Sequence, residues 1–404
     1  MSNLFAGFGR WTVAFLLPLV ALGSGAGAQP SQTAKTPRPL WAGTLFYGVY
    51  KSTDGADHWV PASNGLPPHS GEGASANVSA LAVSQSAPRI AYVAIRVWSL
   101  KALSLKNYTG SNRILVYGTT DGGRSWTRKS RGLPTGRAAS DRRSSSLIAI
   151  DPTNPRVVYA EVVLHSGRGG LFRSRDGGGH WQRLGVRCAN SPPGGPRVCG
   201  PGGGGATGLV INPRAPREIY AASAGVAKST DAGMSWKLWH PYEELRYGCC
   251  TALAIDPGNP SVLYAGAFGV VYKTTDAGRT WVRLSRGLPR RRLNEPTSNV
   301  EVGALAVDPR RPGVVYAGMP RGLYKSTTGG RSWARVSPAE VHDLVIDPES
   351  GVVYAATSGC LGLPPPPGLI CQGQPLIKSS NGGGSWRLAT NLPTNTAVSV
   401  LALG

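Results

Sequence analysis

The chain has 404 residues, of which 41% are hydrophobic and 11 are tryptophan, so it can bury a sizeable core and is not an intrinsically disordered chain. Its 55 glycines and 33 prolines recur at fixed places, which excludes a low-complexity sequence and indicates repeated turns. The formal net charge of +22 favours an anionic partner without choosing between nucleic acid, acidic polysaccharide, membrane and acidic protein.

The N-terminus has the pattern of a secretory signal. Arg10 precedes an apolar run over residues 11–22, and Ala26-Gly27-Ala28 fits a cleavage site. We therefore expect a signal peptide over residues 1–28, a polar linker over residues 29–39, and an exported protein, periplasmic or extracellular. The apolar run is too short to span a bilayer comfortably, and no later stretch approaches that length, so no transmembrane segment is predicted.

One eight-residue pattern, Ser/Thr-x-Asp-x-Gly-x-x-Trp, recurs seven times from residue 52 onwards. Its chemistry is that of a tight turn: the glycine can adopt positive φ, the carboxylate can accept turn N–H groups, and the Trp begins the outgoing strand and buries its ring. The acids are Asp54, Asp121, Asp176, Asp231 and Asp276, and the aromatic residues are Trp59, Trp126, Trp181, Trp236, Trp281, Trp333 and Trp386.

The exceptions to this pattern favour a structural role. The acid is replaced by Thr328 and Asn381 in the last two copies, and the glycine by Ala56 in the first. A turn tolerates these changes, whereas a ring of catalytic or metal-binding carboxylates would not. No metal and no cofactor are predicted.

Each copy belongs to a unit of four short strands. Segments such as residues 253–264 and 305–316 read as an apolar strand, a Pro-containing turn and a β-branched strand, and similar segments begin near Leu81, Leu147, Leu209 and Leu344. A third strand leads into the eight-residue pattern and a fourth leaves it at the Trp. Spacings of 45–67 residues between copies predict the blades of an all-β, seven-bladed β-propeller over residues 40–404.

The sequence also predicts how the ring closes. The first copy lacks an inner strand before it, whereas an unused strand, residues 398–403, stands at the C-terminus. We expect this strand to pair beside the one that begins near Leu40, which completes the N-terminal blade and covers its edge.

The repeats resemble the Asp-box of the BNR, or sialidase-like, propellers, and the resemblance covers nearly all of the chain after the linker. In layout the chain is closest to the Ycf48/Hcf136-like assembly factors, single seven-bladed rings that hold proteins or peptides. The repeats are also similar to those of xyloglucanase-type and sortilin-type propellers. These families imply either a binding protein or a glycoside hydrolase.

Strand order divides the loops between two faces. Turns between the first two strands of a blade share one face with the Asp-box turns, and the longer connections lie on the opposite face, named here the loop face. The ligand-binding candidates there are Arg96, Arg113, Arg142, Arg143, Tyr242, Arg246, Arg290, Arg291 and Arg292. Guanidinium groups beside aromatic rings suit carboxylate, sulfate or phosphate, although arginines also simply solvate a surface.

From this face we predict an exported, monomeric, non-enzymatic binding or assembly scaffold. Its expected partner is an anionic protein segment or an acidic glycan, without specific nucleic-acid binding. The cysteines of the loop face are expected to form two local disulfides, Cys188–Cys199 and Cys360–Cys371, while the state of the adjacent Cys249 and Cys250 stays open.

The alternative function is a glycoside hydrolase, sialidase-like or xyloglucanase-like. Sialidases use three arginines, a Tyr–Glu pair and an acid Asp, which Tyr242, Glu243 and Arg246 only partly imitate. Xyloglucanases set one carboxylate in each of two propellers, and glycosidases generally need two carboxylates roughly 5–10 Å apart. The loop-face acids are Asp141, Glu161, Glu243, Glu244, Glu295 and Glu340. No pair among them stands out, so no catalytic residue is assigned.

Overall fold

The computed structural model describes residues 37–45, 48–67, 70–71, 74–99, 113–134, 147–162, 170–184, 206–222, 225–239, 250–290, 300–357, 375–389, 391–392 and 397–404. All of them belong to one compact unit, Thr36–Gly404. This part of the chain contains no helix that is long and apolar enough to cross a membrane.

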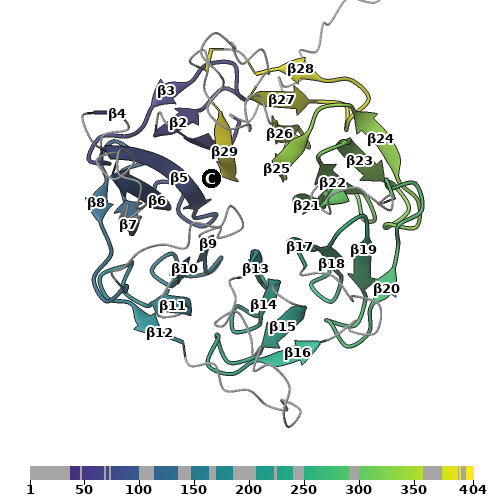
Figure 1. Cartoon of the computed structure of the whole chain (residues 1–404), viewed down its shortest axis with the longest axis horizontal. Coiled ribbons are helices and arrows are strands. Elements are labelled where there is room, and N and C mark those ends of the chain that lie inside the picture. Colours follow the sequence, from purple (N-terminus) through teal and green to yellow (C-terminus); the bar gives the residue numbers. More distant parts are fainter. Residues whose placement is uncertain are drawn as a thin grey trace, which may run out of the picture. The chain divides into compact units, whose positions relative to one another are not determined.

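Seven antiparallel sheets stand around a ring as blades (Figure 1). Blade 1 consists of β29 (Val398–Leu403), β1 (Leu40–Thr44), β2 (Val49–Ser52) and β3 (Val60–Pro61). Blade 2 consists of β4 (Ser70–Gly71), β5 (Ala74–Val83), β6 (Ala91–Ser99), β7 (Arg113–Thr119) and β8 (Thr127–Arg128). Blade 3 consists of β9 (Leu147–Ile150), β10 (Val158–Val162), β11 (Gly170–Ser174) and β12 (Gln182–Arg183).

The remaining blades repeat the same order. Blade 4 consists of β13 (Gly208–Ile211), β14 (Ile219–Ala222), β15 (Val226–Ser229) and β16 (Lys237–Trp239), and blade 5 of β17 (Ala252–Ile255), β18 (Leu263–Gly266), β19 (Val271–Thr274) and β20 (Val282–Arg283). Blade 6 consists of β21 (Ala304–Val307), β22 (Val315–Met319), β23 (Gly322–Ser326) and β24 (Ala334–Ser337), and blade 7 of β25 (Val341–Ile346), β26 (Val353–Thr357), β27 (Leu376–Ser379) and β28 (Arg387–Leu388). The strands nearest the centre of the ring are β29, β5, β9, β13, β17, β21 and β25 (Figure 1).

The C-terminal strand closes the ring. β29 runs antiparallel to β1, with Leu403 opposite Leu40 and Leu401 opposite Ala42. The inner strand of blade 1 therefore comes from the opposite end of the chain from its other three strands, and this pairing covers the edge of β1. The prediction of an all-β, seven-bladed propeller closed in this way is confirmed.

The core lies between neighbouring blades. β1, β10, β14, β18, β22 and β26, each next to the inner strand of its blade, are fully buried. Their aromatic and aliphatic side chains contribute to apolar clusters at the seams. In blades 2, 3, 6 and 7 the Trp of the Asp-box links its blade to the preceding one, because its indole N–H donates to a carbonyl of that blade. Trp126 donates to Ala62 O at 2.7 Å and Trp181 to Lys129 O at 2.7 Å.

The Asp-box turns are closed by their own polar side chains. In blade 3, Asp176 Oδ1 accepts hydrogen bonds from His180 N at 2.9 Å and Ser174 Oγ at 2.8 Å. The two residues after the acid, Gly177 and Gly178, have φ of 74° and 83°, which glycine adopts without strain. Ala56 takes the same left-handed conformation in the first box, at φ 70°. Asn381 and Thr328 still accept the equivalent N–H bonds in the last two boxes.

Candidate functional site

Three of the predicted ligand-binding residues fall in the described part of the loop face. Arg96 lies in β6 and Arg113 opens the neighbouring β7, where it pairs with Val97, so both belong to blade 2. Arg290 is exposed and follows β20 of blade 5. The described candidates therefore lie in two sectors of the ring. The other candidates, Arg142, Arg143, Tyr242, Arg246, Arg291 and Arg292, lie outside the described residues.

Blade 2 has the longest strands in the ring. β5 has 10 residues and β6 has 9, and their pairing runs from Ala74 opposite Ser99 to Val83 opposite Ala91. Arg96 stands opposite Asn77 within this hairpin and is only partly exposed. Burial lowers the pKa of its guanidinium group. Arg96 is thus partly enclosed by the sheet and is not a freely projecting surface arginine.

Glu161 is the most deeply buried carboxyl group of the described loop face. It stands one residue before the end of β10, has 1% exposure, and its Oε1 accepts the N–H of Ala206 at 2.5 Å. Oε2 has no hydrogen-bond partner within the described residues. Burial raises the pKa of Glu161 to about 8, against the smaller lowering by the Ala206 N–H, so the group holds a proton at neutral pH.

Two neighbouring titratable residues, His342 and Asp343, lie near the start of β25. Asp343 Oδ2 accepts Leu401 N–H at 2.6 Å, and the ring nitrogen Nε2 of His342 lies 2.8 Å from Val398 O. Burial raises the pKa of Asp343 to about 6 and lowers the pKa of His342. Neither residue was predicted as a site residue, although two neighbouring titratable residues in an inner strand that is otherwise apolar were a visible signal in the sequence.

The other sequence candidates divide between exposed and undescribed positions. Glu340, three residues before Asp343, is exposed. Asp141, Glu243, Glu244 and Glu295 lie outside the described residues, as do Cys188, Cys199, Cys249, Cys360 and Cys371, so neither predicted disulfide is described. Cys250 is buried. Within the part of the chain that the structure describes, no three His, Cys, Asp or Glu residues gather as metal ligands.

The opposite end of the central channel is hollow. A cavity of about 530 Å³ is lined by the ends of the inner strands and by the prolines of the adjoining turns. Its polar lining residues are Arg38 and Gln85, and Arg38 Nε is held 3.3 Å from Glu349 Oε1. No Asp or Glu lines this cavity in the described structure, so it offers no carboxyl group for acid–base chemistry.

Several known proteins to which the chain is similar are xyloglucanases. Over 235 residues the chain is 26% identical to the xyloglucanase Xgh74A of Acetivibrio thermocellus, covering 48% of this chain and 27% of that protein. The GH74 xyloglucanase of Xanthomonas campestris superposes with a TM-score of 0.61 at 20% identity, covering 88% of this chain and 53% of that one. This structural likeness shows the shared fold. The chain spans about a quarter of the length of its first curated relative and about half of this solved structure.

A structure of YCF48 bound to a D1 peptide superposes with a TM-score of 0.46 at 16% identity, covering 80% of this chain and 91% of that one. No protein-family model matches the chain.

The prediction of a non-enzymatic binding scaffold is wrong. The curated relatives that it matches are xyloglucanases, which favours the glycoside-hydrolase alternative. The error has a physical cause, because Asp-box turns and blade strands build the ring in enzymes and in binding proteins alike. Their presence in the sequence does not distinguish the two classes.

Proposed function

We propose that this chain is a glycoside-hydrolase propeller that acts on a xyloglucan-like β-glucan at its loop face. The observation that carries the proposal is the 26% identity to xyloglucanase Xgh74A over 235 residues, together with the shared ring fold. The predicted signal peptide over residues 1–28 is consistent with this function, because a polymeric glucan is met outside the cell.

Glu161 is the described carboxyl group best suited to donate a proton. A glycosidase acid must be protonated at its working pH, and burial raises the pKa of Glu161 to about 8. Oε2 is the oxygen without a described partner. Asp343 is less suitable, because its two oxygens accept the N–H groups of Leu401 and Leu344. Since Glu161 is buried, the role requires that substrate reach Oε2 from the loop face.

The test is hydrolysis by the purified full chain. Release of reducing ends should be measured with xyloglucan, an unbranched soluble β-glucan and a sialoside, and we expect turnover of xyloglucan. Glu161→Gln should lower kcat by about 100-fold or more if this carboxyl is the general acid. Glu340→Gln, an exposed acid of the same face, and Glu218→Gln, on the opposite face, are the controls. A correctly folded wild-type protein that cleaves none of the β-glucans would overturn the proposal.

If xyloglucan is cleaved and Glu161→Gln remains fully active, only the assignment of the acid is wrong. The acids outside the described residues, Asp141, Glu243, Glu244 and Glu295, would then be replaced one at a time. Because the xyloglucanases of this resemblance use two propellers, the mass of the active species should be measured in the same preparation. This measurement shows whether a single ring or an assembly of rings carries the activity.

A further inference from the structure

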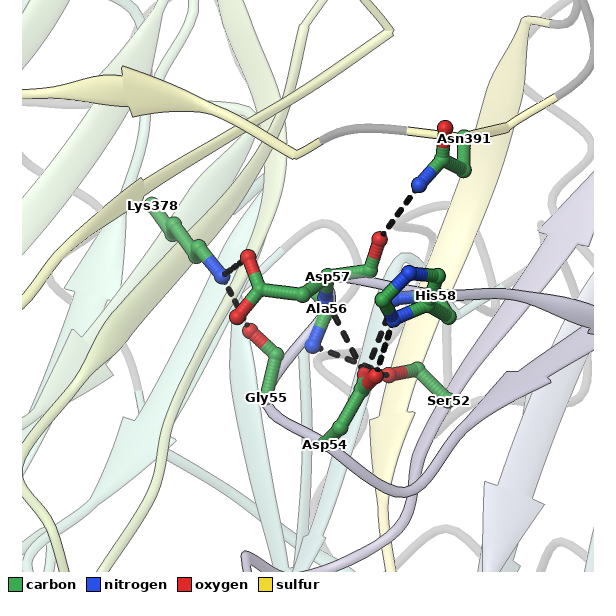
Figure 2. A network of polar contacts seen from close by, with 8 residues as sticks. All are labelled: Ser52, Asp54, Gly55, Ala56, Asp57, His58, Lys378 and Asn391. Carbon is green, nitrogen blue, oxygen red and sulfur yellow. Dashed lines mark hydrogen bonds and ion pairs between the residues drawn. The ribbon is translucent and has the colours of Figure 1, made fainter.

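The seam between blade 7 and blade 1 contains an ion pair inside the Asp-box (Figure 2). Lys378 Nζ in β27 lies 2.6 Å from Asp57 Oδ1 and donates to Gly55 O at 2.6 Å. The lysine side chain is 3% exposed and the aspartate 46%. Asn391 Nδ2 donates to Asp57 O at 3.0 Å and holds the same turn from blade 7. Asp57 therefore neutralises a lysine that the packing of the two blades has buried.

The same lysine position contacts the next box at other seams, but without an acid. Lys325 of blade 6 donates to Gly382 O at 2.6 Å, and Lys51 of blade 1 donates to Gly122 O at 3.1 Å. In blade 3, Arg173 donates to Ala232 O at 2.8 Å and its Nη2 lies 3.7 Å from Met234 Sδ. Met234 and Asp57 occupy the same position, the sixth of the box. This position therefore faces the cation of the preceding blade.

The residue at the sixth box position carries a different charge at different seams. In chain order the seven boxes carry Asp57, Arg124, Gly179, Met234, Arg279, Arg331 and Gly384 there. The residues that precede the boxes, in the same order, are Lys51, Gly118, Arg173, Lys228, Lys273, Lys325 and Lys378. An acid stands at the sixth position only in the box of blade 1, opposite Lys378, whereas the arginines Arg124 and Arg331 stand there opposite Lys51 and Lys273. Lys228 is instead paired within its own blade, where its Nζ lies 3.5 Å from Glu218 Oε2. Burial lowers the pKa of Lys51 and Lys273, and the charges of Arg124 and Arg331 lower it further.

We propose that Asp57 specifies ring closure, by making blade 1 the one blade whose Asp-box attracts the cation presented by its neighbour. Blades of similar shape can pack on one another in more than one order, so shape alone identifies the closing partner poorly. Attraction at one seam and repulsion at others distinguish the correct contact from wrong ones. Asp57 belongs to the N-terminal strands of blade 1 and Lys378 to blade 7, so the contact joins segments from opposite ends of the chain and forms only when β1 and β29 have closed the ring.

The test compares three substitutions at box position six. Asp57→Arg gives the closing seam the charges found at Lys51–Arg124, and Asp57→Asn removes the charge with little change of shape. Arg331→Asp is the matched control, because it places an acid opposite Lys273 at the blade 5–blade 6 seam. Thermal unfolding is followed between about 0.05 M and about 0.5 M NaCl, a range over which screening changes strongly. Hydrogen exchange of β27 and β2 is compared with that of β23.

We expect Asp57→Arg to have a lower Tm than wild type, with only a small recovery at high salt, because salt screens a nearly buried lysine weakly. Exchange of β27 and β2 should rise about tenfold in Asp57→Arg, with β23 unchanged. Arg331→Asp should be stabilised relative to wild type at low salt. If Asp57→Arg does not fold, Asp57→Asn decides, because it should fold and should exchange faster than wild type at β27 and β2 while β23 is unchanged. Unchanged exchange of β27 and β2 in Asp57→Asn, or faster exchange at every seam alike, would overturn the proposal.

Discussion

Asp343 Oδ2 accepts the backbone N–H of Leu401 across 2.6 Å, so a side chain of blade 7 holds the strand that completes blade 1. His342 holds the same strand at Val398 O, 2.8 Å from its Nε2. Both groups titrate, and their pKa values move in opposite directions because burial disfavours the charged form of each. The pH dependence of ring stability therefore has two opposing parts at this seam.

The first prediction concerns Asp343→Asn. The pKa of Asp343 is raised to about 6 in the folded protein, so the folded protein binds this proton more tightly than the unfolded chain does. The stability that follows from this difference is present below about pH 4 and is lost as the pH rises to about 6. Asparagine does not titrate. The free energy of unfolding of Asp343→Asn relative to wild type should therefore rise by roughly 2–3 kcal/mol between about pH 4 and about pH 7.

Chemical denaturation at several pH values measures this difference. The substituted side chain would present an amide donor toward the N–H of Leu344 or Leu401, so the variant should be the less stable protein at acid pH. His342 acts with the opposite sign: its lowered pKa means that stability is lost as the pH falls below about 6.5, and this loss should stand out in the variant. Glu340→Gln is the control. A difference that does not change with pH would contradict the assignment.

The second prediction concerns Asp176 of the third Asp-box. Asp176→Ala removes an acceptor used by His180 N, Ser174 Oγ and His180 Nδ1, and should cost about 1–2 kcal/mol because this turn is largely exposed. Asp176→Asn should be nearly neutral, since Asn381 accepts the equivalent N–H in the seventh box. Urea unfolding compares the two variants. Equal losses in both would mean that the charge, rather than the acceptor geometry, closes the turn.

The Asp-box acids also contribute to acid sensitivity. The side chain and backbone N–H of His180 and the hydroxyl of Ser174 hold the pKa of Asp176 well below its usual range. Stability from such a group is present above the ordinary aspartate pKa and is lost as the pH falls through the lowered value. The contribution of the boxes should therefore be constant at neutral pH.

The repeat made the ring predictable from sequence, because each box marks one turn of one blade. The missing inner strand before Ser52 and the unused strand at residues 398–403 then predicted the closure, which the pairing of Leu40 with Leu403 bears out. The links across the closing seam were not predicted. Asp57 occupies a variable box position, and its role depends on Lys378, 321 residues away, which only the folded ring brings within 2.6 Å.

The candidate site was less predictable for a physical reason. The strands of different blades have similar sequences because each blade packs against its two neighbours in the same way. The loops differ from blade to blade and contain most of the candidate residues. Glu161 was among the predicted acids, but its hydrogen bond from Ala206 N–H of the next blade forms only in the folded ring. The proposed function rests on similarity extending over 235 residues and not on the boxes, which enzymes and binding proteins share.

The third prediction concerns Gly132, which follows the outer strand of blade 2. Its φ is 89°, and a Cβ at this residue would lie 2.7 Å from Trp181 O of the next blade. Gly132→Ala should therefore cost about 2–4 kcal/mol, because the strained backbone and the rigid carbonyl leave the methyl group no room. Gly303→Ala is the matched control, since its Cβ would find its nearest neighbour at 3.8 Å. Comparable Tm values for both variants would contradict the packing argument.

The fourth prediction separates the proposed glucan substrate from the anionic ligand expected from the sequence charge. Xyloglucan is a neutral polymer, so its binding should change by less than about twofold between about 0.05 M and about 0.5 M NaCl, whereas an acidic ligand would be released. The substitution of Arg290, Arg291 and Arg292 by Ser should likewise leave the glucan affinity unchanged. Arg290 is exposed and joins no described ion pair, so this substitution should not unfold the ring. Affinity electrophoresis in xyloglucan gels at both salt concentrations measures the effect, and a loss of retardation that follows salt or the triple substitution would show that charge on the loop face takes part in binding.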